Sequence, residues 1–458
     1  MGKIRTLEDM PLRKFHFQMF FYTGGGAFID GYIIGIIAVA LAVLQPQFEM
    51  SLTLVGIIGM AAYVGMFFGG IIGGYLTDLI GRKTMFILDL SIFVIASIPQ
   101  FFVTDPVQLI ILRLILGFAV GADNPISATY MAEFAPRKHR GALLGGLIAL
   151  WYVGYALSYL VGYWMLALGD DSWRWMLASS AVPALILLVA RLRMPESPMW
   201  LASKGRKSEA NAIVQRIFGK GVILSGSLEK NEKTSFMDMF RNGYGKWTLF
   251  IALFWTLQVA PAFAIATYIP QVLGEFGFAD GSKEFLGSAI MSLFYLVGLL
   301  PAVYLVEKIG RRPVLIWPFL VSSVVLIVLG ITSGWHMSFT FTIALFIIYG
   351  IFNTSMNILQ WIYPNELFPT NIRGTAVGFG TGVSRIGASL STLLFPLILS
   401  KYGLEVTLYV CAALFFIGFL ISLVMAPETR NMTLSETSAL NKSNNQYSNK
   451  PSSNKKSI

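Results

Sequence analysis

Long apolar segments alternate with short polar stretches along almost the whole chain. Each apolar segment has about 20 residues or more, the length that a helix needs to cross the hydrocarbon core of a bilayer. The pattern predicts twelve membrane-spanning helices over 15–44, 52–76, 84–104, 106–132, 141–168, 174–193, 247–272, 284–306, 313–333, 338–362, 374–399 and 403–426. We therefore expect an all-α membrane protein.

Composition and charge placement favour a membrane protein over other classes. Of the 458 residues, 55% are hydrophobic and only 13% are charged, about half the charged share of a soluble domain. The net charge of +10 could suit a nucleic-acid binder, but 29 of the 34 Lys and Arg residues fall on one side of the predicted spans. This bias predicts that both termini are cytoplasmic. We expect a multi-pass protein of the cell membrane that binds no nucleic acid.

One long polar connection divides the spans six and six. It covers residues 194–246 and carries Lys, Glu, Gly and Ser. We predict an N-terminal six-helix bundle over 1–193, a cytoplasmic linker over 194–246 and a C-terminal six-helix bundle over 247–426. Residues 427–458 end in an Asn-, Ser- and Lys-rich stretch that cannot bury a core, so we expect a disordered cytoplasmic tail there.

Three polar motifs recur in the two halves, at offsets of 229, 233 and 232 residues. The pairs are Asp78-Leu-Ile-Gly81-Arg82-Lys83 with Glu307-Lys-Ile-Gly310-Arg311-Arg312, Glu133-Phe-Ala-Pro136-x3-Arg140-Gly141 with Glu366-Leu-Phe-Pro369-x3-Arg373-Gly374, and Pro195-Glu196-Ser197 with Pro427-Glu428-Thr429. Because six spans separate the repeats, both halves have the same orientation. This parallel repeat is typical of transporters whose two bundles rock against each other.

These motifs resemble those of the major facilitator superfamily, most of all its sugar-porter and metabolite:proton symporter branches. The resemblance covers roughly residues 15–430 and includes Arg113-x3-Gly117-x3-Gly121. It implies two pseudo-symmetric six-helix bundles, alternating access, and ion networks that latch the inner side shut. The implied gating residues are Asp78, Gly81, Arg82, Glu133, Arg140, Glu196, Glu307, Arg311, Glu366, Arg373 and Glu428. The alternative is a solvated face, where exposed ion pairs contribute little.

The chain departs from the sugar-porter pattern in several places. Inside the span at 247–272 the chain reads Leu-Gln-Val-Ala-Pro over 257–261, with the one glutamine Gln258 where sugar porters usually have a pair. Asp30 precedes Gly31-Tyr32, whereas the acid of sugar porters follows such a Gly-Tyr. The Asp30-Gly31-Tyr32 segment, the Gly121-Ala-Asp123-Asn-Pro125 segment and Arg385 resemble carriers of organic acids and other metabolites more closely than hexose carriers.

Four ionisable residues, Asp30, Arg113, Asp123 and Arg385, lie inside predicted spans. An unpaired charge near the bilayer centre costs about 2.5–3.5 kcal/mol, so such residues persist where they pair or line a wet cavity. Counting about 1.5 Å per residue places Asp30 and Arg113 at depths where they can meet if the spans at 15–44 and 106–132 are neighbours, as the resemblance implies. We expect Asp30, Arg113 and Asp123 to couple transport to protons, with a static Asp–Arg pair as the alternative. Asp89 lies nearer the inner edge and is expected to be structural.

Arg385 is the candidate for substrate recognition. Its planar donor fork suits a substrate carboxylate, and a salt bridge to Asp30 or Asp123 is the alternative. Neighbouring side chains would supply hydrogen bonds and a ring face for a polar organic molecule, namely Gln258, Asn353, Asn357, Gln360 and Trp361. Trp361 equally fits an interface anchor.

Two glycine stripes have four-residue spacing, Gly65-x3-Gly69-x3-Gly73 and Gly374-x3-Gly378-x3-Gly382. Small residues at this spacing let helix backbones approach closely. They predict either static packing or a sliding interface between the two halves.

These features together predict a secondary transporter that moves a small polar organic metabolite, such as a sugar, a sugar acid or another organic acid, by proton symport. The alternatives are a uniporter, a proton-antiport drug exporter and a nutrient receptor that signals without transport. The sequence has no nucleophile elbow, phosphate-binding loop or metal-ligand spacing, so we expect no enzyme activity, metal or cofactor. The expected partners are the substrate, protons and membrane lipid, and we expect a monomer.

Overall fold

The computed structural model describes residues 5–6, 10–136, 139–219, 222–223, 236–241, 243–278, 283–335, 337–430 and 432. Among these residues, eleven helical segments are long and apolar enough to cross a membrane. The helices of the first bundle are α1 (Lys14–Gln47), α2 (Leu52–Ile80), α3 (Arg82–Ser97), α4 (Pro106–Phe134), α5 (Arg140–Met165), α6 (Ser172–Ala178) and α7 (Ala181–Arg191). Those of the second are α10 (Gly245–Thr267), α11 (Ile269–Leu273), α12 (Lys283–Ile309), α13 (Arg311–Thr332), α14 (Phe339–Leu367) and α15 (Thr370–Met425).

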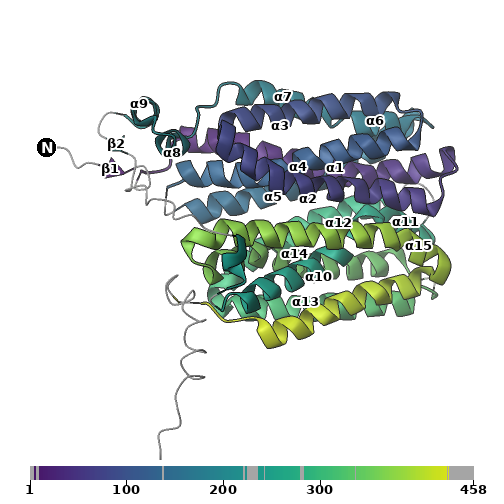
Figure 1. The fold of residues 1–458 in the computed structure, drawn as a ribbon. Coiled ribbons are helices and arrows are strands. Elements are labelled where there is room, and N and C mark those ends of the chain that lie inside the picture. Colours follow the sequence, from purple (N-terminus) through teal and green to yellow (C-terminus); the bar gives the residue numbers. More distant parts are fainter. Residues whose placement is uncertain are drawn as a thin grey trace, which may run out of the picture.

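The last two predicted spans join into one element, α15. At Gly403 its backbone leaves the helical region, with φ 79° and ψ 174°, a conformation that glycine adopts without a Cβ clash. Figure 1 shows that the chain reverses direction there. The eleven segments therefore contain the twelve predicted crossings, and the expected all-helical fold is confirmed. Its strands are two residues each, β1 (Arg5–Thr6) and β2 (Val222–Ile223), which pair in parallel.

Side-chain caps and glycines define the ends of several helices. The Asp105 carboxylate accepts a hydrogen bond of 2.6 Å from the backbone N–H of Val107 and caps α4, whose first residue is a proline. Ser51 and Ser338 cap α2 and α14 in the same way. Gly81 and Gly310, both at φ 103°, separate α2 from α3 and α12 from α13. Polar residues thus fix the helix ends, because each cap binds a backbone N–H that the helix leaves unpaired.

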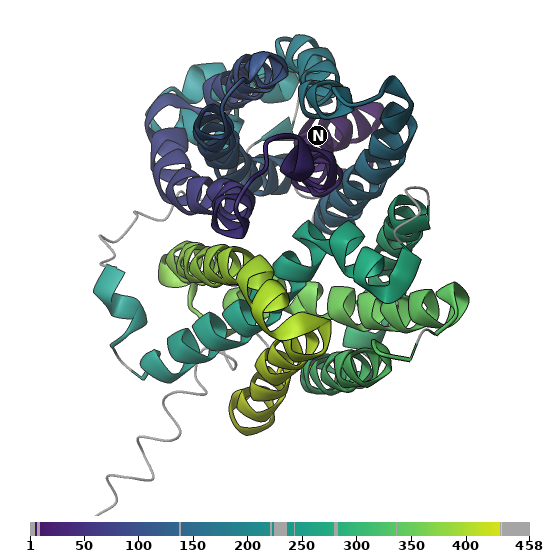
Figure 2. The same cartoon turned by 90° about the vertical axis from the view of Figure 1, so that its right-hand side faces the viewer.

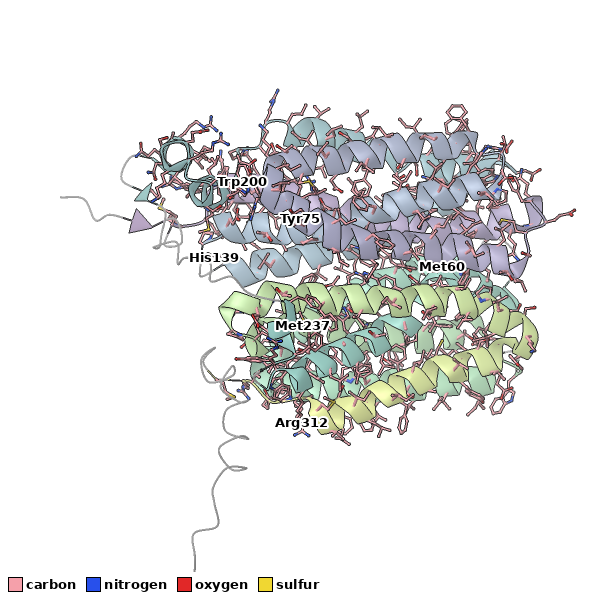
Figure 3. The ribbon with its side chains drawn as sticks, viewed as in Figure 1. Met60, Tyr75, His139, Trp200, Met237 and Arg312 are labelled. Carbon is pink, nitrogen blue, oxygen red and sulfur yellow. The ribbon has the colours of Figure 1, made fainter. Side chains whose placement is uncertain are left out.

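The two halves form separate bundles that lie side by side, the first in purple to blue and the second in green to yellow (Figures 1 and 2). Large apolar side chains are exposed on the outer surface, among them Phe102, Ile186 and Leu300, as lipid contact requires. We call the end of both bundles that carries Arg82, Arg311 and the short helices α8 (Pro198–Ser203) and α9 (Lys207–Phe218) the basic end. Figure 3 shows His139, Trp200 and Arg312 toward this end and Met60 toward the opposite one.

The first glycine stripe packs inside the first bundle. A Cβ at Gly69 would lie 1.9 Å from the carbonyl oxygen of Phe118, and one at Gly65 would lie 2.2 Å from that of Leu114, both on α4. Static packing is therefore the structural role of this stripe. In the second stripe, Gly378 has open space around it and Gly382 faces Phe67 of the first bundle at 3.6 Å.

Hydrogen bonds between the bundles occur from mid-span toward the end opposite the basic end. The Tyr63 hydroxyl lies 3.1 Å from the Thr267 hydroxyl. Tyr155 and Tyr159 of α5 both donate to the carbonyl oxygen of Ala266, at 3.2 and 2.8 Å. This carbonyl is near the end of α10, where helical partners run out. We call Tyr63, Tyr155, Tyr159, Ala266 and Thr267 the tyrosine gate.

Candidate functional site

Asp30 is completely buried in α1. One of its carboxylate oxygens accepts a hydrogen bond of 3.3 Å from the side-chain amide of Asn124 on α4, and the other has no hydrogen-bond partner. Among the described residues, no cation lies within ion-pair distance of Asp30. The carboxyl group is therefore held by a neutral donor alone, an arrangement that disfavours the ionised form.

Arg113 and Asp30 do not form the contact that their depths allowed. The Arg113 guanidinium is buried and donates to the carbonyl oxygen of Ile33 at 3.0 Å, while its Nε has no partner. Both residues lie at suitable depths, but their side chains have separate partners. Arg113 therefore ties α4 to α1 through the backbone.

Asp123 pairs with Arg191 of α7 instead. The Arg191 Nη1 and Asp123 Oδ1 atoms are 3.0 Å apart, and neither side chain is exposed. The Ser127 hydroxyl donates to the other Asp123 oxygen at 2.9 Å. Arg191 lies near the end of the predicted span at 174–193, as the last residue of α7, and its side chain points into the bundle.

Three amide side chains of the second bundle bind one another. Gln258 of α10 donates to the Asn353 side-chain oxygen on α14 at 2.8 Å, and Gln360 donates to the Gln258 side-chain oxygen. All three residues are buried. We call them the amide cluster. Amides paired in this way can exchange partners with a polar ligand at small cost, because each carries both donors and acceptors.

Asn357 lies one helical turn from Asn353 and reaches the other bundle. Its side-chain amide donates to the Tyr152 hydroxyl on α5. Trp361, a further turn along α14, packs edge-on against Trp255 with ring centroids 5.9 Å apart. The polar residues predicted on α14 therefore lie on one face, and that face meets the amide cluster and α5.

Arg385 is half-buried in α15, and its guanidinium lies 5.3 Å from the centroid of the Phe263 ring. It makes no ion pair to Asp30, Asp123 or any other described carboxylate, so the salt-bridge alternative is not formed here. Its charge interacts electrostatically with that of Asp30 across the bundle interface. Arg385 is thus a cation whose guanidinium donates to none of the residues that the structure describes, and the Phe263 ring is its neighbour.

At the basic end of the first bundle, Glu133 and Glu196 organise the loop between α2 and α3. Arg82 Nε lies 3.4 Å from a Glu133 oxygen. Glu196 accepts from the backbone N–H groups of Arg82 and Lys83, at 3.0 and 3.2 Å. The Ser197 hydroxyl donates to Glu133. We call this arrangement the first corner.

The second bundle repeats this corner almost contact by contact. Arg311 binds Glu366 at 3.0 Å and Glu307 at 3.2 Å. Glu428 accepts from the backbone of Arg311 and Arg312, at 3.0 and 3.1 Å, and Thr429 donates to Glu366. We call this the second corner. Each corner closes within its own bundle.

The remaining gating residues are placed less fully. Burial lowers the pKa of the Arg373 guanidinium below its usual range, and this side chain makes no ion pair in the described part of the chain. The side chains of Asp78 and Arg140 lie outside the described residues. The positive φ at Gly81 explains why glycine precedes Arg82, since other residues are strained there.

Several residues at these sites were not predicted from the sequence. Asn124, Tyr152 and Phe263 each contact a predicted residue, and Arg191 pairs with Asp123. The signal for Arg191 was its place at the end of an apolar run. Tyr152 and Phe263 carried no signal, because aromatic residues are common throughout the spans.

One hollow among the described residues lies away from these side chains. It measures about 510 Å³, at the end opposite the basic end. Its lining residues are Ala42, Gln45, Pro46, Glu49, Met50 and Gln271. It therefore contains none of the predicted substrate-binding residues.

Comparisons with known proteins support a transporter. The model of the family "Sugar (and other) transporter" matches residues 19–440. YaaU of Escherichia coli (strain K12), described as a metabolite transport protein, is 37% identical over 95% of this chain and 97% of its own. The arabinose-proton symporter of Bacillus subtilis (strain 168) is 28% identical over 91% and 93%. A partially occluded inward-open structure of the xylose transporter XylE from E. coli superposes with a TM-score of 0.79 at 22% identity, over 92% of this chain and 100% of that one.

The structural likeness and the family match agree with the repeated corners and the two bundles. The chain therefore belongs to the sugar (and other) transporter family of the major facilitator superfamily, and it is a multi-pass membrane transporter of small molecules and not an enzyme.

Proposed function

We propose that this transporter moves a small organic acid by proton symport, through alternating access. The observation that carries the proposal is Arg385, a half-buried guanidinium without a carboxylate partner, set over the Phe263 ring. An unpaired cation within a membrane protein is costly. A substrate carboxylate would neutralise it with two parallel hydrogen bonds, the geometry that arginine favours.

The amide cluster and Asn357 would hold the polar part of the same substrate. Gln258, Asn353 and Gln360 hydrogen-bond to one another. Hydrogen bonds to hydroxyl or carbonyl groups of the substrate would replace these hydrogen bonds within the cluster. Trp361 and Phe263 would supply ring faces. A sugar acid or a small aromatic acid combines these features in one molecule.

Asp30 is the proposed coupling residue. Its buried carboxyl has a neutral partner on one oxygen and none on the other, so a bound proton stabilises this state. Opening the site to water and bringing Arg385 closer would both favour release, since water and a cation stabilise the ionised carboxylate. The arabinose-proton symporter is a relative whose name states the same coupling.

We further infer that the basic end faces the cytoplasm, as its excess of Lys and Arg supports. The bundles contact each other at the tyrosine gate, away from that end, and Gly378 near the basic end has open space around it. This arrangement suits an inward-facing state. Each corner would then stiffen its own bundle. The first corner and the second corner would move apart or closer together as the bundles rock.

The substrate class is tested by thermal unfolding of the purified protein with nicotinate, D-glucuronate, D-xylose or L-arabinose. We expect an acid to raise the unfolding temperature of wild type and not of Arg385→Gln. Arg174→Gln is the matched control, because Arg174 binds Asp171 at the membrane rim. Stabilisation by neutral sugars alone, equal in Arg385→Gln, would contradict the acid assignment.

Coupling is tested with the stabilising compound in protein-containing vesicles. We expect uptake against a gradient to require a proton gradient and to stop with an uncoupler. Asp30→Asn should lose this accumulation and keep exchange between labelled and unlabelled substrate. Uptake that ignores the proton gradient would identify a uniporter.

A further inference from the structure

A second group of buried charges lies apart from Arg385, between α1, α3, α4 and α7. Its centre is the ion pair of Asp123 and Arg191, both completely buried. The Arg191 Nε also donates to the carbonyl oxygen of Tyr22 at 2.8 Å, and the guanidinium covers the Phe86 ring at 4.1 Å. Arg191 is therefore fixed, with one carboxylate as its ionic partner among the described residues.

Gly26 makes room for this pair. A Cβ at residue 26 would lie 2.2 Å from the Asp123 Oδ2 atom and 2.4 Å from the Arg191 Nη2 atom. These distances are far below contact distance. The glycine lets α1 cover the pair closely and keeps water away from it.

Asp89 of α3 is the unexplained member of the group. It is 2% exposed, and neither of its carboxylate oxygens has a hydrogen-bond partner. Its side chain lies within hydrogen-bonding reach of the Asp123 carboxyl, although no N–H or O–H group of the described residues donates to it, and it interacts electrostatically with Arg191. The sequence predicts a structural role for Asp89. A buried aspartate with a structural role would accept hydrogen bonds from neighbouring donors.

Charge balance gives the group its chemistry. Two carboxylates and one guanidinium carry a net charge of −1, and a buried uncompensated charge costs several kcal/mol. One bound proton makes the group neutral. Two neighbouring carboxyls that cannot both ionise share a single proton, as a like charge disfavours the second ionisation.

Other titratable groups on the packed helices α1 and α4 face the group of Asp89, Asp123 and Arg191. Asp30 on α1 interacts electrostatically with Asp89, Asp123 and Arg191. On α4, Tyr130 interacts with Arg191, and its hydroxyl proton is engaged at the carbonyl oxygen of Pro195. Asn124, which binds Asp30, directly follows Asp123, so the two sites are adjacent along α4.

We propose that Asp89, Asp123 and Arg191 form a proton-binding site in the first bundle, separate from Asp30, that holds one proton on its carboxyl pair. Arg191 acts as a positioning residue that holds the Asp123 carboxyl through the ion pair and leaves Asp89 as the carboxyl without a cation of its own. The role of this site in transport rests on the proton coupling proposed above, because the site would exchange its proton with Asp30 or with water at the basic end.

The test uses the full chain in lipid vesicles at neutral pH, with the proton as the only ligand. Infrared absorption distinguishes protonated carboxyl groups from carboxylates. We expect Asp89→Asn to lose one protonated-carboxyl signal and to unfold at the wild-type temperature, because asparagine is neutral and of equal size. Arg191→Gln should gain one signal, because without the guanidinium the carboxyl pair needs a second proton to be neutral.

Ser127→Ala is the matched control, since it removes a hydrogen bond to Asp123 and leaves the charges unchanged. We expect its number of signals to equal that of wild type. An Asp89→Asn spectrum identical to that of wild type overturns the inference, even where Arg191→Gln cannot be purified. A signal lost in Asp89→Asn and unchanged in Asp30→Asn supports this site and contradicts the role proposed for Asp30.

Discussion

Arg82 and Arg311 are equivalent residues of the two bundles. Each begins a helix after a glycine at φ 103°, donates from Nη1 to a backbone carbonyl oxygen five residues earlier at 3.2 Å, and binds a glutamate of a neighbouring helix. Tyr130 and Tyr363 extend the equivalence, donating to Pro195 and Pro427. The corners therefore reinforce each bundle from within.

Removing the charge of a corner should destabilise the bundle that holds it. We expect Glu366→Gln to lower the free energy of unfolding by about 1–3 kcal/mol, because Arg311 would lose one of its two glutamate partners and Thr429 would lose its charged acceptor. Glu133→Gln should behave alike. Thermal unfolding of the purified protein measures the change.

The control for both corner variants is Glu209→Gln on α9. Glu209 binds Arg206 at 2.6 Å with both side chains about half exposed, and this pair lowers the pKa of the Glu209 carboxyl. Exposed pairs add little stability, so the unfolding temperature should stay unchanged. If the unfolding temperature of Glu209→Gln falls as far as those of the corner variants, the result contradicts the stabilising role of the corners.

The tyrosine gate should show non-additive behaviour. Tyr155 and Tyr159 donate to one carbonyl oxygen, so Tyr155→Phe or Tyr159→Phe alone leaves Ala266 with a donor. The double variant leaves it with none, and we expect this end to open more often. Residues that share a partner couple in this way.

The opening can be followed by labelling a single cysteine. Cys411, which is buried, is the chain's one cysteine and can be replaced by alanine. Thr267→Cys then reports on the gate through its reaction rate with a membrane-impermeant maleimide. We expect a clear rise in the double variant and a small one in each single variant. Equal rates in all of them would mean that these bonds do not hold the gate.

The two glycine stripes should respond differently to alanine. Gly69→Ala places a Cβ 1.9 Å from the Phe118 carbonyl oxygen, and the helices must separate to admit it. We expect a loss of folded protein and a lower unfolding temperature. Gly378→Ala meets nothing within 4 Å and should keep wild-type stability. Size-exclusion yield and thermal unfolding measure both, and equal losses would contradict the assignment.

Gly26→Ala should disrupt the buried ion pair. Its Cβ would overlap Asp123 and Arg191, and separating a buried pair costs about 3–5 kcal/mol when one charge is left without compensation. Gly145→Ala, with open space around residue 145, is the control in the same bundle. Thermal unfolding gives the comparison. A Gly26→Ala protein as stable as the control would show that α1 yields easily at this point.

The apolar pattern was enough to predict the helices, because the bilayer demands a length that few other structures need. It could not reveal that the last two spans run together through the turn at Gly403, or that the sixth span breaks into α6 and α7. The corners followed from the repeat. The partners of the buried polar side chains could not be predicted, because the depth of a residue along a helix does not give the direction in which its side chain points. Asp123 and Asn124 are neighbours in the chain, but Asp123 binds Arg191 and Asn124 binds Asp30.

The corners are duplicated, but the charged residues between the bundles are not. One repeat length after Asp30 the chain reads Val-Ala-Pro-Ala-Phe over 259–263, and one repeat length before Arg385 it reads Tyr-Val-Gly-Tyr-Ala over 152–156. Neither stretch has an Asp, Glu, Lys, Arg or His residue. A symmetric scaffold thus carries an asymmetric pair, a carboxyl group in one bundle and a guanidinium in the other, and the proposed rocking of the bundles would change the distance between them.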